Sequence, residues 1–286
     1  MSRIGETFAR LKSEGRGGLI PFITAGDPNI ETTRQLLIAL GGAGSDLIEL
    51  GVPFSDPIAD GPVIQRASER ALRHHIGVAH ILQLVAETRS EIDVPLVIFS
   101  YLNPLLQFGV DRFAAEAARA GVDGLLVTDL PLEEAGEFSR ALAANSLDLI
   151  LLVAPTSSDE RLRIIADKAS GFIYAISRTG VTGATTELSK EAENLVARVR
   201  ALSDLPVAVG FGISNSQQVS EVWRYADAAV VGSAIVAQIE KHAARPDLVK
   251  IVEEFVRSLV PGTGSRSTSN IARRPLTGSA PEGSGQ

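Results

Sequence analysis

The chain has 286 residues, 45% of them hydrophobic and 21% charged, which is the composition of an ordinary globular protein. Its formal net charge of −7 argues against binding to nucleic acid or to an anionic membrane, since both require a basic face. It contains no cysteine, which excludes disulfides, thiolate metal sites and a thiol nucleophile. The segment from Met1 to Arg16 lacks the apolar core of a signal peptide, and no apolar run reaches the roughly 18 residues of a membrane helix. We therefore expect a cytoplasmic protein.

Short apolar runs alternate with longer amphipathic stretches from Gly18 to about Leu259. Most of the runs are unbroken rather than alternating, which is typical of parallel strands covered on both faces. The predicted strands are Leu19–Thr24, Asp46–Leu50, Val94–Ser100, Gly124–Val127, Leu147–Val153, Gly171–Ile176, Pro206–Gly210 and Ala228–Val231.

Between these strands, apolar residues recur at spacings of three and four, which predicts helices. The predicted helices are Glu31–Leu40, one containing Val63–Leu72, Ile81–Arg89, Phe113–Arg119, Glu133–Ala144, Glu160–Ala169 and Leu188–Leu202, with a short helix at the N-terminus. Strands that each lead into a helix, repeated in this way, predict a TIM (β/α)8 barrel as a single domain over residues 1–260. An open, doubly wound sheet is the structural alternative, because strand counts from one sequence are error-prone.

The last 26 residues, 261–286, differ in kind from the rest. They hold five Gly, five Ser, three Thr and three Pro, with Ile271 and Leu276 as their large aliphatic residues. So little apolar area does not offset the entropy lost on ordering, so we expect a disordered tail.

Glu49 is the sharpest candidate for chemistry. The active sites of TIM barrels lie at the carboxyl ends of the strands, and Glu49 is next to the end of an apolar strand. An ionised carboxylate facing a dry interior is costly there. The alternative is a structural carboxylate held by a backbone group or an arginine.

The loop that follows Glu49 carries two further carboxylates, Asp56 and Asp60, each close to a proline. Either can act in catalysis, but an aspartate just before a helix that begins with proline is also a good N-cap. A magnesium site made by this pair is weakly supported, because hard cations take more oxygen ligands. We predict no metal site. The histidines at 74, 75 and 80 are expected on the surface.

Glycine-rich segments follow the last three predicted strands: Gly180–Gly183, Gly210–Gly212 and Gly232–Ser233. TIM barrels often bind phosphate with the loops after strands seven and eight and the N-terminus of a short helix. Together these loops predict a phosphate site, although each glycine alone could serve a turn or a helix cap. Tyr174, within the sixth strand, could face the barrel mouth or pack in the core.

Three longer runs resemble the tryptophan synthase alpha chain family. They are PFITAGDP at 21–28, IELGVPFSDPIADGP at 48–62 followed by IQRA at 64–67, and SRTGVTGA at 177–184. Shorter matches are YLNP at 101–104, DLP at 129–131, VGFGI at 209–213 and VGSA at 231–234. The resemblance covers roughly residues 5–259. The departures are the tail and Ser100, where an aliphatic residue near the substrate is expected.

The resemblance implies cleavage of indole-3-glycerol phosphate to indole and glyceraldehyde 3-phosphate, without a metal or organic cofactor. Glu49 would be the general acid/base, and Asp60 would accept the indole N–H. The implied substrate contacts are Phe22, Ile64, Leu126, Tyr174, Thr182, Gly183, Phe211, Gly212, Gly232 and Ser233, with Arg178–Ala184 as a lid.

The family also implies a partner, the tryptophan synthase beta subunit, in an alpha2beta2 heterotetramer. It would bind the rim near Pro53–Asp56 and Asn103 and receive indole. Two alternatives stay open: a free-standing indole-3-glycerol phosphate lyase, and a non-catalytic barrel that binds a phosphorylated metabolite. The presence of both Glu49 and Asp60 argues against the second.

Overall fold

Eight parallel strands close into one barrel in the order β1 to β8, in a computed structural model that describes residues 1–176, 185–210 and 212–262. The strands are β1 (Gly18–Thr24), β2 (Ile48–Gly51), β3 (Leu96–Ser100), β4 (Gly124–Val127), β5 (Asp148–Val153), β6 (Ile173–Ile176), β7 (Val207–Gly210) and β8 (Ala228–Val231). Each overlaps a predicted strand. Pairing of β1 with β8 completes the ring, so the barrel prediction is confirmed and the open-sheet alternative is wrong.

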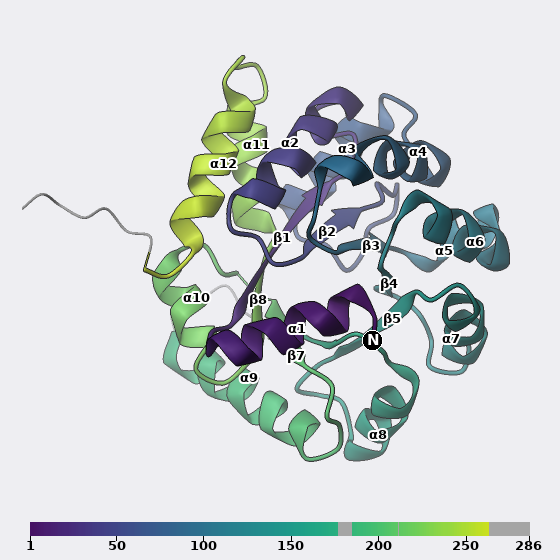
Figure 1. The fold of residues 1–286 in the computed structure, drawn as a ribbon, viewed down its shortest axis with the longest axis vertical. Coiled ribbons are helices and arrows are strands. Elements are labelled where there is room, and N and C mark those ends of the chain that lie inside the picture. Colours follow the sequence, from purple (N-terminus) through teal and green to yellow (C-terminus); the bar gives the residue numbers. More distant parts are fainter. Residues whose placement is uncertain (177–184, 211, 263–286) are drawn as a thin grey trace, which may run out of the picture.

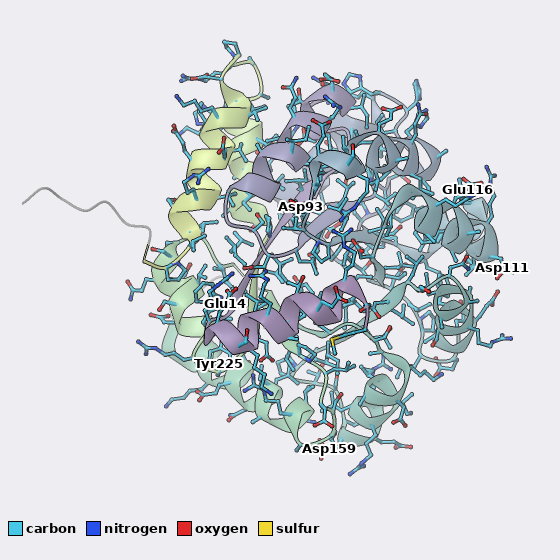
Figure 2. The ribbon with its side chains drawn as sticks, in the orientation of Figure 1. Glu14, Asp93, Asp111, Glu116, Asp159 and Tyr225 are labelled. Carbon is cyan, nitrogen blue, oxygen red and sulfur yellow. The ribbon has the colours of Figure 1, made fainter. Side chains whose placement is uncertain are left out.

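Helices surround the barrel on its outside (Figure 1). They are α1 (Arg3–Glu14), α2 (Ile30–Gly42), α3 (Pro62–Leu72), α4 (Val78–Thr88), α5 (Leu102–Phe108), α6 (Val110–Ala120), α7 (Ala135–Ala144), α8 (Asp159–Lys168), α9 (Thr185–Arg200), α10 (Ser216–Val222), α11 (Ser233–His242) and α12 (Leu248–Leu259), with a short 3-10 turn, η1 (Arg89–Glu91). The predicted helices are all present. No residue range was predicted for helices α5, α10, α11 and α12. Charged side chains such as Asp111 and Asp159 lie on the outer edge of the helical ring (Figure 2).

Helix α1 lies across the N-terminal end of the barrel and faces the viewer in Figure 1. It begins at an N-cap, Ser2, whose side chain accepts a hydrogen bond from the backbone N–H of Gly5 at 3.2 Å. Its buried face is Ile4, Phe8 and Leu11, and the Phe8 ring lies 5.6 Å from that of Phe172. The helix therefore closes this end of the barrel with apolar packing.

The strand register stacks the inward-facing side chains in layers, each made by alternate strands. From the N-terminal end the layers are Leu47, Gly124, Phe172 and Ala228; then Ile20, Val97, Ile150 and Ala208; then Glu49, Leu126, Tyr174 and Val230; then Phe22, Phe99, Leu152 and Gly210. The first two layers are apolar and form one buried cluster with α1. Glu49 thus lies in the first layer that carries polar side chains.

Helix α12 ends at Leu259, close to the predicted domain boundary at residue 260. Of the predicted tail, residues 263–286 lie outside the described residues, so the division into a domain and a disordered tail stays a prediction. Within the described ranges, the helices are too short or too polar to cross a membrane.

Candidate active site

Glu49 is fully buried inside the barrel, at 0% exposure. Neither of its carboxylate oxygens has a hydrogen-bond partner among the described residues. Burial raises the pKa of Glu49 to about 8, because the charged form has lost its hydration. Among the described residues, therefore, no backbone group or arginine holds this carboxylate, which favours the catalytic interpretation over the structural one. The side chain is protonated at neutral pH and can give up a proton close to the working pH.

The surroundings of Glu49 are apolar and aromatic. Leu126 and Tyr174 share its layer, and Phe22 and Phe99 form part of the layer above. The rings of Phe22 and Phe99 meet edge to face, with centroids 5.1 Å apart and planes at 73°. These two rings form an aromatic wall beside Glu49.

Tyr174 faces the interior, which decides between its two predicted placements in favour of the barrel mouth. Burial raises the pKa of Tyr174 well above its ordinary value, and the nearby carboxylates of Glu49 and Asp60 add to the effect. A side chain at Gly210 would collide with the Tyr174 hydroxyl, so the tyrosine needs glycine at that position. Tyr174 is thus a neutral phenol beside both candidate acids.

Asp60 lies half-buried in the loop between β2 and α3. Burial raises the pKa of Asp60 to about 6, while a hydrogen bond from the Tyr101 hydroxyl lowers it. The same hydroxyl accepts a hydrogen bond from the backbone N–H of Ala59 at 2.9 Å. The N-cap of α3 is Gly61, with no side-chain cap. The capping alternative for Asp60 is therefore wrong.

Asp56 differs from Asp60 in its setting. It is exposed, and its carboxylate accepts a hydrogen bond from the Ser55 hydroxyl at 2.5 Å. Only one of the two loop aspartates thus belongs to the buried site. The histidines at 74, 75 and 80 are exposed, as predicted.

Three residues of the site were missed by the sequence analysis. Phe99 lines the interior, Tyr101 holds Asp60, and Thr24 is buried at the carboxyl end of β1 with a hydroxyl that has no partner among the described residues. A polar residue at the end of an apolar strand was the available signal for Thr24 and Tyr101.

The expectation that Ser100 lies near the substrate is wrong. Side chains alternate along a strand, and β3 presents Val97 and Phe99 to the interior, so Ser100 points toward the surrounding helices. Its hydroxyl donates to the carbonyl of Tyr101 at 2.8 Å. The position facing the pocket is therefore the neighbouring Phe99.

The predicted phosphate site falls at the start of α11. Gly232 is the N-cap and Ser233 the first helical residue, where backbone N–H groups and the helix dipole attract an anion. A side chain at Gly232 would lie 3.5 Å from the Phe22 ring, so this helix end adjoins the aromatic wall. Gly212, with φ of 55°, adopts the left-handed conformation that favours glycine.

Several predicted contacts lie outside the described residues: Thr182, Gly183, Phe211 and the lid segment 178–184. For these positions the resemblance alone carries the prediction.

A cavity of about 960 Å³ lies at the opposite end of the barrel, beside α1, lined by residues that include Phe8, Lys12 and Trp223. One carboxylate that lines it, Asp227, pairs with Arg200 at 3.0 Å. The chemical signal at the carboxyl ends of the strands is Glu49, whose carboxylate has no hydrogen-bond partner among the described residues.

Comparison with known proteins agrees with this geometry. The sequence profile described as "Tryptophan synthase alpha chain" matches residues 8–260. The chain belongs to the tryptophan synthase alpha chain family. The alpha chain of Solibacter usitatus is 49% identical over 267 residues, covering 93% of this chain and all of its own length. That of Acidiphilium cryptum is 51% identical over 240 residues, covering 84% of this chain and 87% of its own.

Solved structures give the same result for the fold. The tryptophan synthase subunit alpha of Legionella pneumophila superposes with a TM-score of 0.83 at 39% identity, covering 91% of this chain and 97% of that one. A chain of Mycobacterium tuberculosis tryptophan synthase gives a TM-score of 0.83 at 37% identity, with coverage of 91% and 97%. Membership of the family makes the chain a lyase of tryptophan biosynthesis, acting on indole-3-glycerol phosphate.

Proposed function

We propose that Glu49 is the general acid and base of indole-3-glycerol phosphate cleavage, and that Asp60 is the carboxylate that stabilises the indole nitrogen. The observation that carries the proposal is Glu49 itself, a fully buried carboxyl without a partner among the described residues and with a pKa of about 8. Perturbed acids of this kind are typical of catalytic sites.

The reaction begins with Glu49 in its protonated form. Glu49 transfers its proton to C3 of the indole ring, which turns the ring into a cationic indolenine. Asp60 has a pKa of about 6 and is therefore largely ionised at neutral pH. Its carboxylate accepts a hydrogen bond from the ring N–H and stabilises the positive charge. Tyr101 keeps the Asp60 carboxylate in place through its hydrogen bond.

The second step breaks the carbon–carbon bond. Glu49, now a carboxylate, takes the proton of the side-chain hydroxyl next to the ring, and the oxygen forms an aldehyde. The electron pair of the broken bond returns to the ring, which leaves neutral indole and glyceraldehyde 3-phosphate. The proton that Glu49 gave is thereby restored. Every proton has a named donor and acceptor, so the step needs no metal or organic cofactor.

The remaining interior residues fit the two ends of this substrate. Phe22, Ile64 and Leu126 would wall the indole, with Tyr174 beside Glu49. At the other end the phosphate would bind backbone N–H groups at Gly212, Gly232 and Ser233, and the Ser233 hydroxyl would add a hydrogen bond. Thr182, Gly183 and Phe211 complete the proposed set by resemblance.

We propose the beta subunit as the partner, in an alpha2beta2 heterotetramer. The rim around Pro53–Asp56 supports this placement. Ile58, in the same loop, is 87% exposed, compared with 51% for Leu106 and 38% for Ile164. On the same rim a cavity of about 470 Å³ is lined by residues that include Pro53, Phe54 and Asn103. A cytoplasmic location stays a prediction, in keeping with the absence of cysteine.

Indole release from the purified chain tests the proposal. The chain is given indole-3-glycerol phosphate with and without a beta subunit. Slow release alone and strong acceleration by the partner are expected. Fast release alone would point to a free-standing lyase, and no release in either case would leave a barrel that only binds phosphorylated metabolites.

A further inference from the structure

Four charged side chains form a continuous ionic network outside the site described above. The guanidinium of Arg70 holds Asp27 in a two-pronged contact, with N–O distances of 2.7 and 2.8 Å. Its third nitrogen donates to Glu240 at 2.7 Å. Arg66 grips the same Glu240 with two contacts of 2.7 Å. Asp27 is only 1% exposed, so the network reaches from the surface into the interior.

The network joins three elements. Asp27 follows strand β1, Arg66 and Arg70 lie on helix α3, and Glu240 lies on helix α11. The same three elements meet in a small apolar cluster, where Phe22, Ala67 and Val236 pack together with Ile64 against them. Ala67 and Arg70 are one turn apart on α3, as Val236 and Glu240 are on α11. The ion pairs therefore join, one turn further along, the three elements that pack together around Phe22.

Each of the two helices begins at one end of the proposed substrate. Helix α3 starts at Pro62, two residues after Asp60, and carries Ile64. Helix α11 starts at Ser233, where the phosphate would bind. The contact between α3 and α11 thus sets the span between the indole end and the phosphate end.

We infer that Arg70 is a positioning residue, which fixes the distance between the indole-binding and phosphate-binding ends of the site by tying α3 to α11 through Glu240 and to β1 through Asp27. The inference rests on the proposed function. A ligand anchored at both ends gains affinity when its two subsites are held in register, and loses that gain when one shifts. The affinity of a ligand that is anchored at one end only does not depend on the distance between the two subsites.

The difference in affinity between these two kinds of ligand distinguishes a positioning role from a role in stability alone. Two ligands are titrated calorimetrically into the full chain: glycerol 3-phosphate, which has the phosphate anchor alone, and indole-3-propanol phosphate, which has both anchors and cannot be cleaved. Replacing Arg70 with Met should weaken the second ligand at least about tenfold and the first less than about threefold. Arg70→Lys should recover only part of the lost affinity. The lysine ammonium can pair with one of the two carboxylates that Arg70 contacts, but not with both.

Arg16 provides a matched control. It makes the same kind of two-pronged contact with a buried aspartate, Asp46, at 2.8 and 2.9 Å, and it also contacts Glu14. It lies at the opposite end of the barrel. Arg16→Met should lower thermal stability but leave both affinities unchanged. Glu240→Gln leaves the contact between Arg70 and Asp27 intact and serves as a second variant if the Arg70→Met chain does not fold. It should also weaken indole-3-propanol phosphate more than glycerol 3-phosphate.

Equal weakening of both ligands, or of neither, by Arg70→Met and Glu240→Gln would overturn the inference. Failure of the proposed function is a separate result, visible in the unaltered chain. There the indole-bearing ligand would bind no more tightly than glycerol 3-phosphate.

Discussion

Buried carboxylates lie at both ends of the barrel, and Glu49 at the C-terminal end differs from those at the N-terminal end in its hydrogen bonding. At the N-terminal end, Asp46 accepts hydrogen bonds from the backbone N–H of Leu19 and from two arginines, and Asp148 accepts one from Ser2. At the C-terminal end, Glu49 has no partner among the described residues. Satisfied acids stabilise a fold, whereas an unsatisfied buried acid destabilises it and is retained for chemistry. For Glu49 and Asp46, hydrogen bonding rather than burial separates the proposed catalytic acid from the structural one.

Substitution of Glu49 should have the largest effect. Glu49→Gln removes the proton that C3 of the indole receives, so kcat should fall by about a thousandfold or more, while phosphate-ligand affinity is largely kept. Asp46→Asn, the counterpart at the other end, should lower the melting temperature and leave turnover unchanged at temperatures where the chain is folded. The measurement is indole release. Equal turnover in the two variants would contradict the proposal that Glu49 is catalytic and Asp46 structural.

Asp60→Asn should come next, with a loss of about a hundredfold in the cleavage rate, since a neutral amide stabilises the cationic ring poorly. Single-turnover kinetics separate this loss from a loss of binding. A change confined to thermal stability, with the rate intact, would return Asp60 to the class of structural acids.

Disturbing the phosphate end should act mainly on substrate binding. Gly212→Asp places a negative charge and a strained side chain in the loop after β7, so KM should rise at least about tenfold with a smaller change in kcat. The control is Gly15→Asp, since Gly15 is also left-handed, with φ of 67° and open space around it. A KM that stays constant in the Gly212 variant would refute this location for the phosphate.

The smallest effect concerns stability and its dependence on pH. The pKa of Glu49 rises from its ordinary value of 4.5 to about 8 in the folded chain. Burial of this carboxyl is therefore tolerated below pH 4.5 and becomes increasingly destabilising as the pH rises toward 8. Relative to the natural chain, Glu49→Gln should gain on the order of 5 °C in melting temperature between pH 5 and pH 8.5. A difference that is constant with pH would mean that Glu49 titrates normally.

The sequence predicted the strands and the position of Glu49 because both depend on local pattern. An apolar run shows where a strand lies, and a charge near its end is visible without knowing its neighbours. The choice between catalytic and structural roles for Glu49 was not available from the sequence, since it depends on which groups approach the carboxylate in three dimensions.

The errors and omissions have the same origin. Ser100 and Phe99 are adjacent, and the alternation along β3 decides which of them faces the interior. The contact of Tyr101 with Asp60 and the network of Arg70 with Asp27 and Glu240 join segments far apart in the chain. Strand register and helix packing create such contacts, and neither is written in local spacing.

The protonation state of Glu49 is the most direct test, and infrared difference spectroscopy can monitor it across a pH titration. We predict a carboxylic acid C=O band that disappears as the pH rises, with a midpoint at about pH 8, and that is missing from the Glu49→Gln chain. A Glu49 band that titrates near the ordinary glutamate pKa of 4.5 would contradict this prediction, because the carboxyl would then have no proton to give at neutral pH.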